Sequence, residues 1–147
     1  MLPDFDENGN LPPGQYVVNT DEIFNRFTWN NKRKKLYEGL VAALKNLAEA
    51  GVMRVWLNGS FVTAKDEPAD IDGCWEPNPS VDADKLDPVF LDLNPPRTAM
   101  KAKYGVDFLV AWVRIADGGN RYVQDFFQED RNGNAKGILV VELRKGQ

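Results

Sequence analysis

The sequence contains no histidine and only one cysteine among its 147 residues. Without histidine, the Ser-His-Asp and Cys-His classes of hydrolase are excluded, and so are the usual zinc sites. Without a second cysteine no intrachain disulfide can form, which fits a reducing compartment. Acid–base or metal chemistry must therefore rest on carboxylates, lysines, tyrosines or the thiol of Cys74. Cys74 itself has two open interpretations, a buried small hydrophobic residue and a reactive thiol.

Long apolar segments are also missing, because no run approaches the roughly 20 residues that span a bilayer. The N terminus has neither the positive nor the apolar segment of a signal peptide. We therefore predict a cytoplasmic protein without membrane contact. The net charge of −4 repels a bare polyanion, which argues against a dedicated DNA or RNA binder, and we predict no DNA binding. This charge suits a site that uses Mg²⁺ to bring in a phosphate-bearing ligand.

Length and composition are those of one globular domain, with 43% hydrophobic and 27% charged residues. Such a chain needs no metal to fold, so any metal is expected to be functional. Residues 1–19 are rich in Pro, Gly, Asn and Asp, which predicts an extended N-terminal arm before a single domain at 20–147. Thr20 is the predicted N-cap of a short helix that ends near Phe27.

The strongest helical pattern runs from Lys32 to Ala50, where apolar residues recur at three- and four-residue steps before Gly51. The start of this helix, residues 32–35, is entirely basic although positive charge there opposes the helix dipole. Two interpretations are open: these side chains contact a phosphate or a nucleic-acid backbone, or they form a solvated first turn.

The remaining elements are predicted from short apolar runs and turn residues. They are strands at 52–57, 70–75, 105–113 and 137–143, a helix at 121–128, turns at 117–120 and 132–134, and a loop at 76–98 with one helical turn. Together they predict an α/β (α+β) fold, a small mixed β-sheet with one long helix and shorter ones packed on it. Trp56, Trp75 and Trp112 are expected to fill the core, with base stacking as the alternative for Trp75.

Asp-x-Asp occurs three times, beginning at residues 4, 70 and 82. Only Asp70 and Asp72 flank an apolar residue, Ile71, at the start of a predicted strand. Strand alternation then directs both carboxylates to one face, with Cα atoms about 6–7 Å apart. The two side chains are therefore predicted to share a metal ion.

Two further features accompany this pair. Gly59 and Ser60 end the preceding strand, where glycine permits close backbone approach and the amides and hydroxyl can hold phosphate oxygens. Asp107 is a lone carboxylate in an apolar strand. If that strand lies beside strand 70–75, three carboxylates converge and repel one another unless a cation such as Mg²⁺ or Mn²⁺ lies between them.

Asp107 has a second interpretation. It stands at the start of its strand, where it is exposed or paired with one of three nearby cations, Lys101, Lys103 or Arg114. This interpretation assigns Asp107 a structural role only.

The order strand, Gly-Ser, Asp-x-Asp, strand aspartate resembles the nucleotidyltransferase superfamily of DNA polymerase β type in its minimal form. The stretches that carry the resemblance are Leu57-Asn58-Gly59-Ser60, Ala69-Asp70-Ile71-Asp72 and Val106-Asp107-Phe108. The whole chain also resembles a group of small uncharacterised bacterial proteins, which share its Leu-Pro-Pro-Gly and Gly-Ser-Phe-Val-Thr-Ala-Lys stretches.

The resemblance implies a role for each residue. Asp70 and Asp72 would bind two metal ions that bridge a nucleoside triphosphate, and Asp107 would complete the catalytic metal site and help to activate the acceptor hydroxyl. Gly59 and Ser60 would hold the terminal phosphates.

The chain departs from the family in three ways. Minimal members usually carry Arg-Gly soon after Gly-Ser, whereas here Lys65 is the candidate phosphate-binding cation. Gly73 replaces the usual apolar residue after the second aspartate, and no C-terminal helical domain follows.

The resemblance implies metal-dependent transfer of an NMP from an NTP to an acceptor, which is a protein or an RNA. It also implies that the protein acts in a toxin–antitoxin or phage-defence pair, with the acceptor as its partner. The alternative is a non-catalytic binding or antitoxin-like regulatory module that retains the nucleotidyltransferase fold. A third interpretation is a sugar- or nucleotide-binding protein without catalysis.

Overall fold

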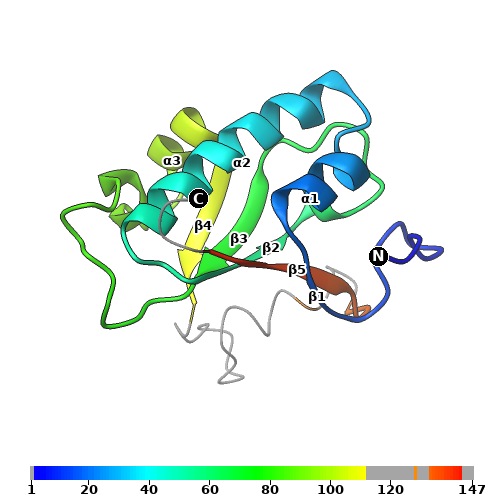
Figure 1. Cartoon of the computed structure of the whole chain (residues 1–147). Helices are drawn as coiled ribbons and strands as arrows, with labels where there is room; N and C mark the ends of the chain where they lie inside the picture. Colours follow the sequence, from blue (N-terminus) through cyan, green and yellow to red (C-terminus); the bar gives the residue numbers. More distant parts are fainter. Residues whose placement is uncertain (1, 112–127, 129–132, 144–147) are drawn as a thin grey trace.

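The computed structural model describes residues 2–111, 128 and 133–143, which form an α+β fold around a five-stranded mixed sheet (Figure 1). The strands are β1 (Gly14–Val17), β2 (Arg54–Asn58), β3 (Ile71–Trp75), β4 (Val106–Val110) and β5 (Gly137–Glu142). The helices are α1 (Thr20–Phe27), α2 (Asn31–Glu49) and α3 (Thr98–Tyr104), with 3₁₀ turns η1 (Ser60–Val62) and η2 (Pro88–Leu91). The predicted fold class is confirmed.

The order of strands across the sheet is β1-β5-β2-β3-β4. β2 runs antiparallel to both of its neighbours, β5 and β3, whereas β3 and β4 are parallel. The end of β2 and the starts of β3, β4 and β5 therefore meet at one edge of the sheet. The helices cover one face, where they bury the main apolar core (Figure 1). A smaller buried cluster on the opposite face includes Trp56, Cys74 and Ile138.

Both N-terminal helices begin with an asparagine cap. The Asn19 side chain accepts a hydrogen bond from the backbone N–H of Glu22, and the Glu22 side chain accepts one from Asn19 N–H. This reciprocal pair satisfies amides that the helix leaves unpaired. The predicted cap at Thr20 is therefore wrong by one residue, because Thr20 is already the first helical residue. Asn30 caps α2 in the same way, through the N–H of Arg33.

Part of the predicted N-terminal arm belongs to the sheet. Gly14–Val17 pairs in parallel with β5, and Leu11 before it is fully buried. The pairing joins residues more than a hundred positions apart in sequence, so no local sequence pattern predicts it. The arm is extended, as its prolines and glycines predict, but its strand β1 is also an edge strand of the sheet.

The segment 76–98 is a loop with one helical turn, η2, as its prolines predict. α3, which follows this loop, was not predicted. The predicted helix at 121–128 and turn at 117–120 lie outside the described residues except for residue 128, and Trp112 lies outside them too. Trp56 and Trp75 are buried as predicted. None of the described helices is long and apolar enough to cross a membrane.

Candidate metal centre

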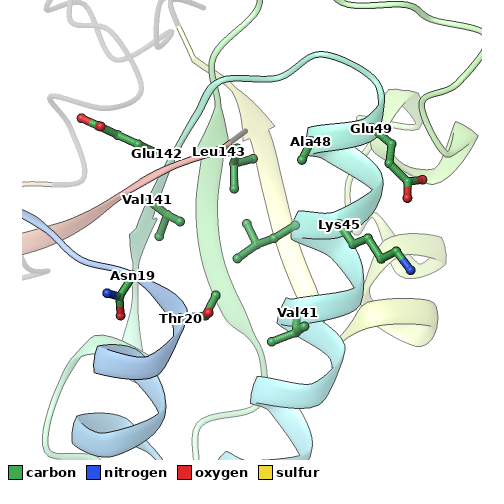
Figure 2. A pocket seen from close by; sticks show the side chains of 10 residues that line it. Asn19, Thr20, Val41, Lys45, Ala48, Glu49, Val141, Glu142 and Leu143 are labelled. Atoms are coloured by element: carbon green, nitrogen blue, oxygen red, sulfur yellow. The ribbon is translucent and has the colours of Figure 1, made fainter. Parts of the chain in front are cut away.

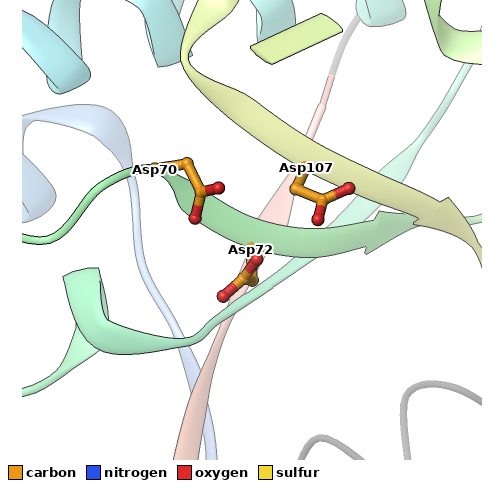
Figure 3. A group of neighbouring side chains, drawn as sticks. All are labelled: Asp70, Asp72 and Asp107. Atoms are coloured by element: carbon orange, nitrogen blue, oxygen red, sulfur yellow. The ribbon is translucent and has the colours of Figure 1, made fainter. Parts of the chain in front are cut away.

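Three carboxylates converge at the sheet edge where β3 and β4 begin. Asp70 immediately precedes β3, and the parallel register sets Asp72 of β3 opposite Asp107 of β4. Each of the three residues offers an oxygen, and these oxygens lie within 4.8 Å of one another (Figure 3). The side chains are all partly buried. The convergence that the sequence predicts conditionally, if the two strands are neighbours, is confirmed.

The end of β2 forms the other wall of this cluster. Asn58 is opposite Asp72 in the antiparallel register, and Gly59 follows it with a φ of 79°, a conformation that disfavours side chains. A Cβ atom on Gly59 would lie 2.1 Å from Oδ2 of Asp72, well inside van der Waals contact. Glycine is therefore required here for two reasons, its backbone angle and the space that the Asp72 carboxylate occupies.

The environment of the cluster disfavours its negative charge. Burial, followed by the nearby charges of Asp70 and Asp107, raises the pKa of Asp72 to about 6 against the opposing effect of Lys136 and Lys101. Burial and the charge of Asp107 also raise the pKa of Asp70, although a hydrogen bond with Asp72 lowers it. Repulsion and loss of hydration are the physical causes, and a bound cation would relieve both.

Asp107 is held by two basic side chains. Arg97 donates from Nε to Oδ1 at 2.5 Å and from Nη2 to Oδ2 at 3.3 Å, a two-bond geometry that favours Arg–carboxylate pairs. Nζ of Lys101 lies 3.6 Å from Oδ2. The structural interpretation of Asp107 correctly included Lys101, but Lys103 pairs instead with Asp87, and Arg114 is outside the described residues. Asp107 is therefore a member of the carboxylate cluster and, at the same time, the partner of Arg97 in an ion pair.

Sequence reasoning missed Arg97. It lies in the proline-rich loop before α3, and no periodicity or motif marks it. Its pKa is raised by its hydrogen bond to Asp107. The charge of Asp72 raises the pKa of Arg97 as well, so Arg97 lies near two of the three acids.

Lysines from three different elements surround the acids. The charge of Lys101 of α3 lowers the pKa of both Asp70 and Asp72. The charge of Lys32 of α2 lowers that of Asp70, and the charge of Lys136, before β5, lowers that of Asp72. Lys65, the cation proposed from the sequence, is not among them. The Lys65 side chain is exposed, and its backbone carbonyl accepts a hydrogen bond from Arg33.

Arg33 is fully buried and holds the segment that follows Gly59. Its guanidinium donates to the carbonyls of the turn, and its centre lies 3.7 Å from the ring centroid of Trp29. The accepting carbonyls belong to Phe27, Ser60, Phe61, Thr63 and Lys65. Both interpretations of the basic stretch 32–35 are therefore wrong for Arg33, which is neither solvated nor available to a phosphate.

Ser60 begins η1 beside the cluster. Its carbonyl accepts hydrogen bonds from Arg33 and from the Thr63 hydroxyl, which fixes the backbone of the turn. Its own hydroxyl makes no hydrogen bond within the described part of the chain. The hydroxyl is thus free for a ligand that approaches the end of β2.

The chemistry of the donors fits a small divalent cation. Carboxylate oxygens are the preferred ligands of Mg²⁺ and Mn²⁺, and an oxygen engaged by a cationic side chain keeps a second lone pair. Opposite oxygens around Mg²⁺ lie about 4 Å apart, at about 2.1 Å from the ion. The oxygens of the cluster lie within 4.8 Å of one another, so they are near enough for one such ion to contact more than one of them.

One cavity of the described residues lies away from the carboxylate cluster. It has a volume of about 570 Å³ and opens between α1, α2 and the end of β5 (Figure 2). Its lining includes Val41, Lys45 and Leu143 and none of the predicted site residues. Cys74 contributes to no site, because burial raises the pKa of its thiol to about 12 and leaves it unreactive at neutral pH.

The fold and the site together define an α+β protein with a candidate divalent-cation centre at one edge of its sheet. A family model matches residues 3–142, and the chain belongs to that family, a family of unknown function designated DUF6932. No curated protein and no solved structure matches the chain.

Proposed function

We propose that this protein is a metal-dependent nucleotidyltransferase that moves an NMP from an NTP to a hydroxyl of an acceptor, with Mg²⁺ or Mn²⁺ as cofactor and the cytoplasm as its location. The observation that supports the proposal is the convergence of Asp70, Asp72 and Asp107 beside Gly59. Two of these acids are destabilised in their charged form, so a cation would bind to them favourably.

The reaction forms a bond from the acceptor oxygen to the α-phosphorus and breaks the bond to the bridging oxygen, so pyrophosphate leaves. Divalent ions, when bound, supply positive charge for the attacking and leaving oxygens. Asp70 and Asp72 would hold those ions against the triphosphate, and Asp107 would lie on the acceptor side, where it would help to remove the proton of the acceptor hydroxyl. The free hydroxyl of Ser60 and the close backbone at Gly59 suit the terminal phosphates.

The test measures metal binding first and transfer second. Calorimetry with Mn²⁺ is followed by incubation with each of the four NTPs, labelled at the α-phosphate, with Mg²⁺ and with candidate protein and RNA acceptors. We expect Mn²⁺ to bind and one labelled NTP to release pyrophosphate. Asp72→Asn is expected to lose both activities.

Asp84→Asn is the matched control, because Asp84 is an exposed aspartate in another Asp-x-Asp pair. It should leave Mn²⁺ binding and transfer unchanged. Equal Mn²⁺ affinity in wild type and Asp72→Asn would overturn the metal site. Normal metal binding without transfer of any NTP would overturn the catalytic proposal alone.

A second candidate is a non-catalytic binding or antitoxin-like module with the same fold. The ion pair between Arg97 and Asp107 favours it, since the guanidinium supplies part of the positive charge that a metal would provide. This candidate predicts that the protein forms a stable complex with a partner protein and binds no Mn²⁺. The first calorimetric titration therefore separates the two functions.

A further inference from the structure

A groove lined by lysines leads away from the carboxylate cluster. It has a volume of about 300 Å³ and lies between the first two turns of α2 and the C-terminal half of α3. Four lysines line it, two from each helix: Lys32, Lys35, Lys101 and Lys103. At Gly39 the backbones of α2 and α3 approach closely, since a Cβ there would lie 2.1 Å from the Tyr104 carbonyl oxygen.

The four lysines differ in their partners. Lys101 is close to Asp107 and Lys103 is bonded to Asp87. Lys32 and Lys35 form no hydrogen bond or salt bridge with any residue in the described ranges. Their position also lowers the stability of α2, because its first turn contains no acidic residue and positive charge opposes the helix dipole. Among the described residues, Lys35 has no partner that explains its position, and Lys32 has the charge of Asp70 nearby.

The groove ends at the carboxylates. Ala69 in its lining directly precedes Asp70, Gly105 lies two residues before Asp107, and Lys101 contacts Asp107 itself. Gly59 is on the other side of the cluster, because β3 separates β2 from β4 in the sheet. A donor whose phosphates lie at Gly59 and Ser60 leaves the α3 side open for the acceptor.

We propose that this groove binds the phosphodiester backbone of a single-stranded nucleic-acid acceptor and directs its reacting hydroxyl to the carboxylate cluster. The proposal rests on the proposed function only in making the strand an acceptor; binding by the groove stands independently. Lysine binds phosphate as a flexible point charge, and backbone contacts of this kind carry no sequence information. The one aromatic residue of the groove, Tyr104, has its hydroxyl bonded to Asp87.

These features define how binding behaves. Affinity depends strongly on salt and weakly on sequence, since neither a base-reading group nor an open stacking platform lines the groove. Because the net charge of the chain is −4, binding is confined to this groove rather than spread over the surface. With two to four lysines engaged, affinity falls on the order of 7- to 50-fold between 50 and 200 mM salt.

The test is fluorescence anisotropy with 12-nucleotide RNA and DNA strands of the same mixed sequence, in EDTA so that no metal takes part. Lys32→Glu/Lys35→Glu should weaken binding at least tenfold. Lys34→Glu/Lys45→Glu, with the same charge change on exposed positions of α2 outside the groove, should change it less than threefold. Circular dichroism and thermal melting verify that both variants fold.

Tighter binding of RNA identifies the ribose as part of the recognised ligand, and equal binding of both strands identifies the backbone alone; either result supports the proposal. No binding at 50 mM salt, or equal losses in the two lysine variants, overturns it. Asp72→Asn should bind the strand at least as tightly as wild type, because it removes a nearby negative charge. A protein that binds strands but transfers no nucleotide would contradict the proposed function and leave this inference intact.

Discussion

The segment from Gly59 to Lys65 lies between two regions in which the buried charges differ in how well they are paired. On one side, Arg33 is fully buried and donates to five backbone carbonyls, so its positive charge is surrounded by acceptors. On the other side, three carboxylates share a site in which Arg97 and Lys101 are paired with only one of them, Asp107.

The difference separates a structural charge from a functional one. Burial lowers the pKa of Arg33 to about 10, but the group stays charged at neutral pH and its hydrogen bonds join two segments of the fold. Asp70 and Asp72 have raised pKa values and no comparable set of donors among the described residues. A satisfied charge stabilises the structure, whereas an unsatisfied cluster attracts a ligand.

Removal of the satisfied charge should have the largest effect. Arg33→Met leaves several carbonyls without partners, so we expect the free energy of unfolding to fall by about 3–5 kcal/mol. Urea denaturation followed by circular dichroism measures this loss. Lys34→Met, one residue away and exposed, should change stability by less than about 0.5 kcal/mol. A loss below about 1 kcal/mol for Arg33→Met would show that the carbonyls find other donors.

Gly59→Ala tests the close contact between Gly59 and Asp72. The substitution adds backbone strain at φ 79° and a clash with Asp72, and we expect a loss of about 2–4 kcal/mol. Gly133→Ala is the matched control, because Gly133 has the same φ of 79° and nothing within 4 Å of the added Cβ. The difference between the two losses, measured by urea denaturation, isolates the clash. Combining Gly59→Ala with Asp72→Ala should recover part of that difference, because the Cβ of Asp72, which the substitution keeps, would still lie 2.9 Å from the added Cβ.

Asp72→Asn should have the opposite sign from Arg33→Met. With a folded-state pKa of about 6 against 3.8 when unfolded, Asp72 binds more protons in the folded state between these values. The stability of the metal-free protein should therefore fall as pH rises from about 4 to about 6. Asp72→Asn removes this slope and should stabilise the protein by about 1–2 kcal/mol at pH 7 and by little near pH 3.5.

Thermal melting from pH 3.5 to 7.5 in EDTA measures the effect, with Asp84→Asn as the variant that should keep the wild-type slope. Saturating Mn²⁺ should stabilise wild type alone and so reverse the ranking at pH 7. A wild type that is more stable than Asp72→Asn at pH 7 in EDTA would mean that the cluster is a satisfied network like that of Arg33.

The smallest expected effect tests whether Arg97 competes with a cation. Arg97→Gln removes a positive charge beside Asp107, so we expect Mn²⁺ affinity to rise about two- to fivefold, equivalent to about 0.4–1 kcal/mol. Calorimetry at fixed ionic strength measures it. Lys103→Gln, on the same side of the fold but bonded to Asp87, should leave the affinity unchanged. A fall in affinity for Arg97→Gln would indicate instead that Arg97 positions Asp107 for the metal.

Local sequence patterns were sufficient for the elements that form by local rules. The periodic apolar residues of α2, the prolines of the loop at 76–98 and the alternation around Ile71 each correspond to the observed structure. α3 was missed because it is a short helix whose formation depends on contacts with α2 and β4 rather than on its own pattern. β1 was assigned to the arm for a similar reason, since its partner β5 is distant in sequence.

For this protein the sequence by itself determined the candidate acids, since an Asp-x-Asp at the start of a strand directs both side chains to one face. It also identified Gly59, whose need for close approach follows from its lack of a side chain. Only the tertiary structure decided that β3 and β4 are neighbours, which basic groups surround Asp107, and that Arg33 is structural while Lys32 and Lys35 line a groove. The physical reason is that charge interactions act through space, so the partner of a charged residue is set by the packing of distant segments and leaves no local trace in the sequence.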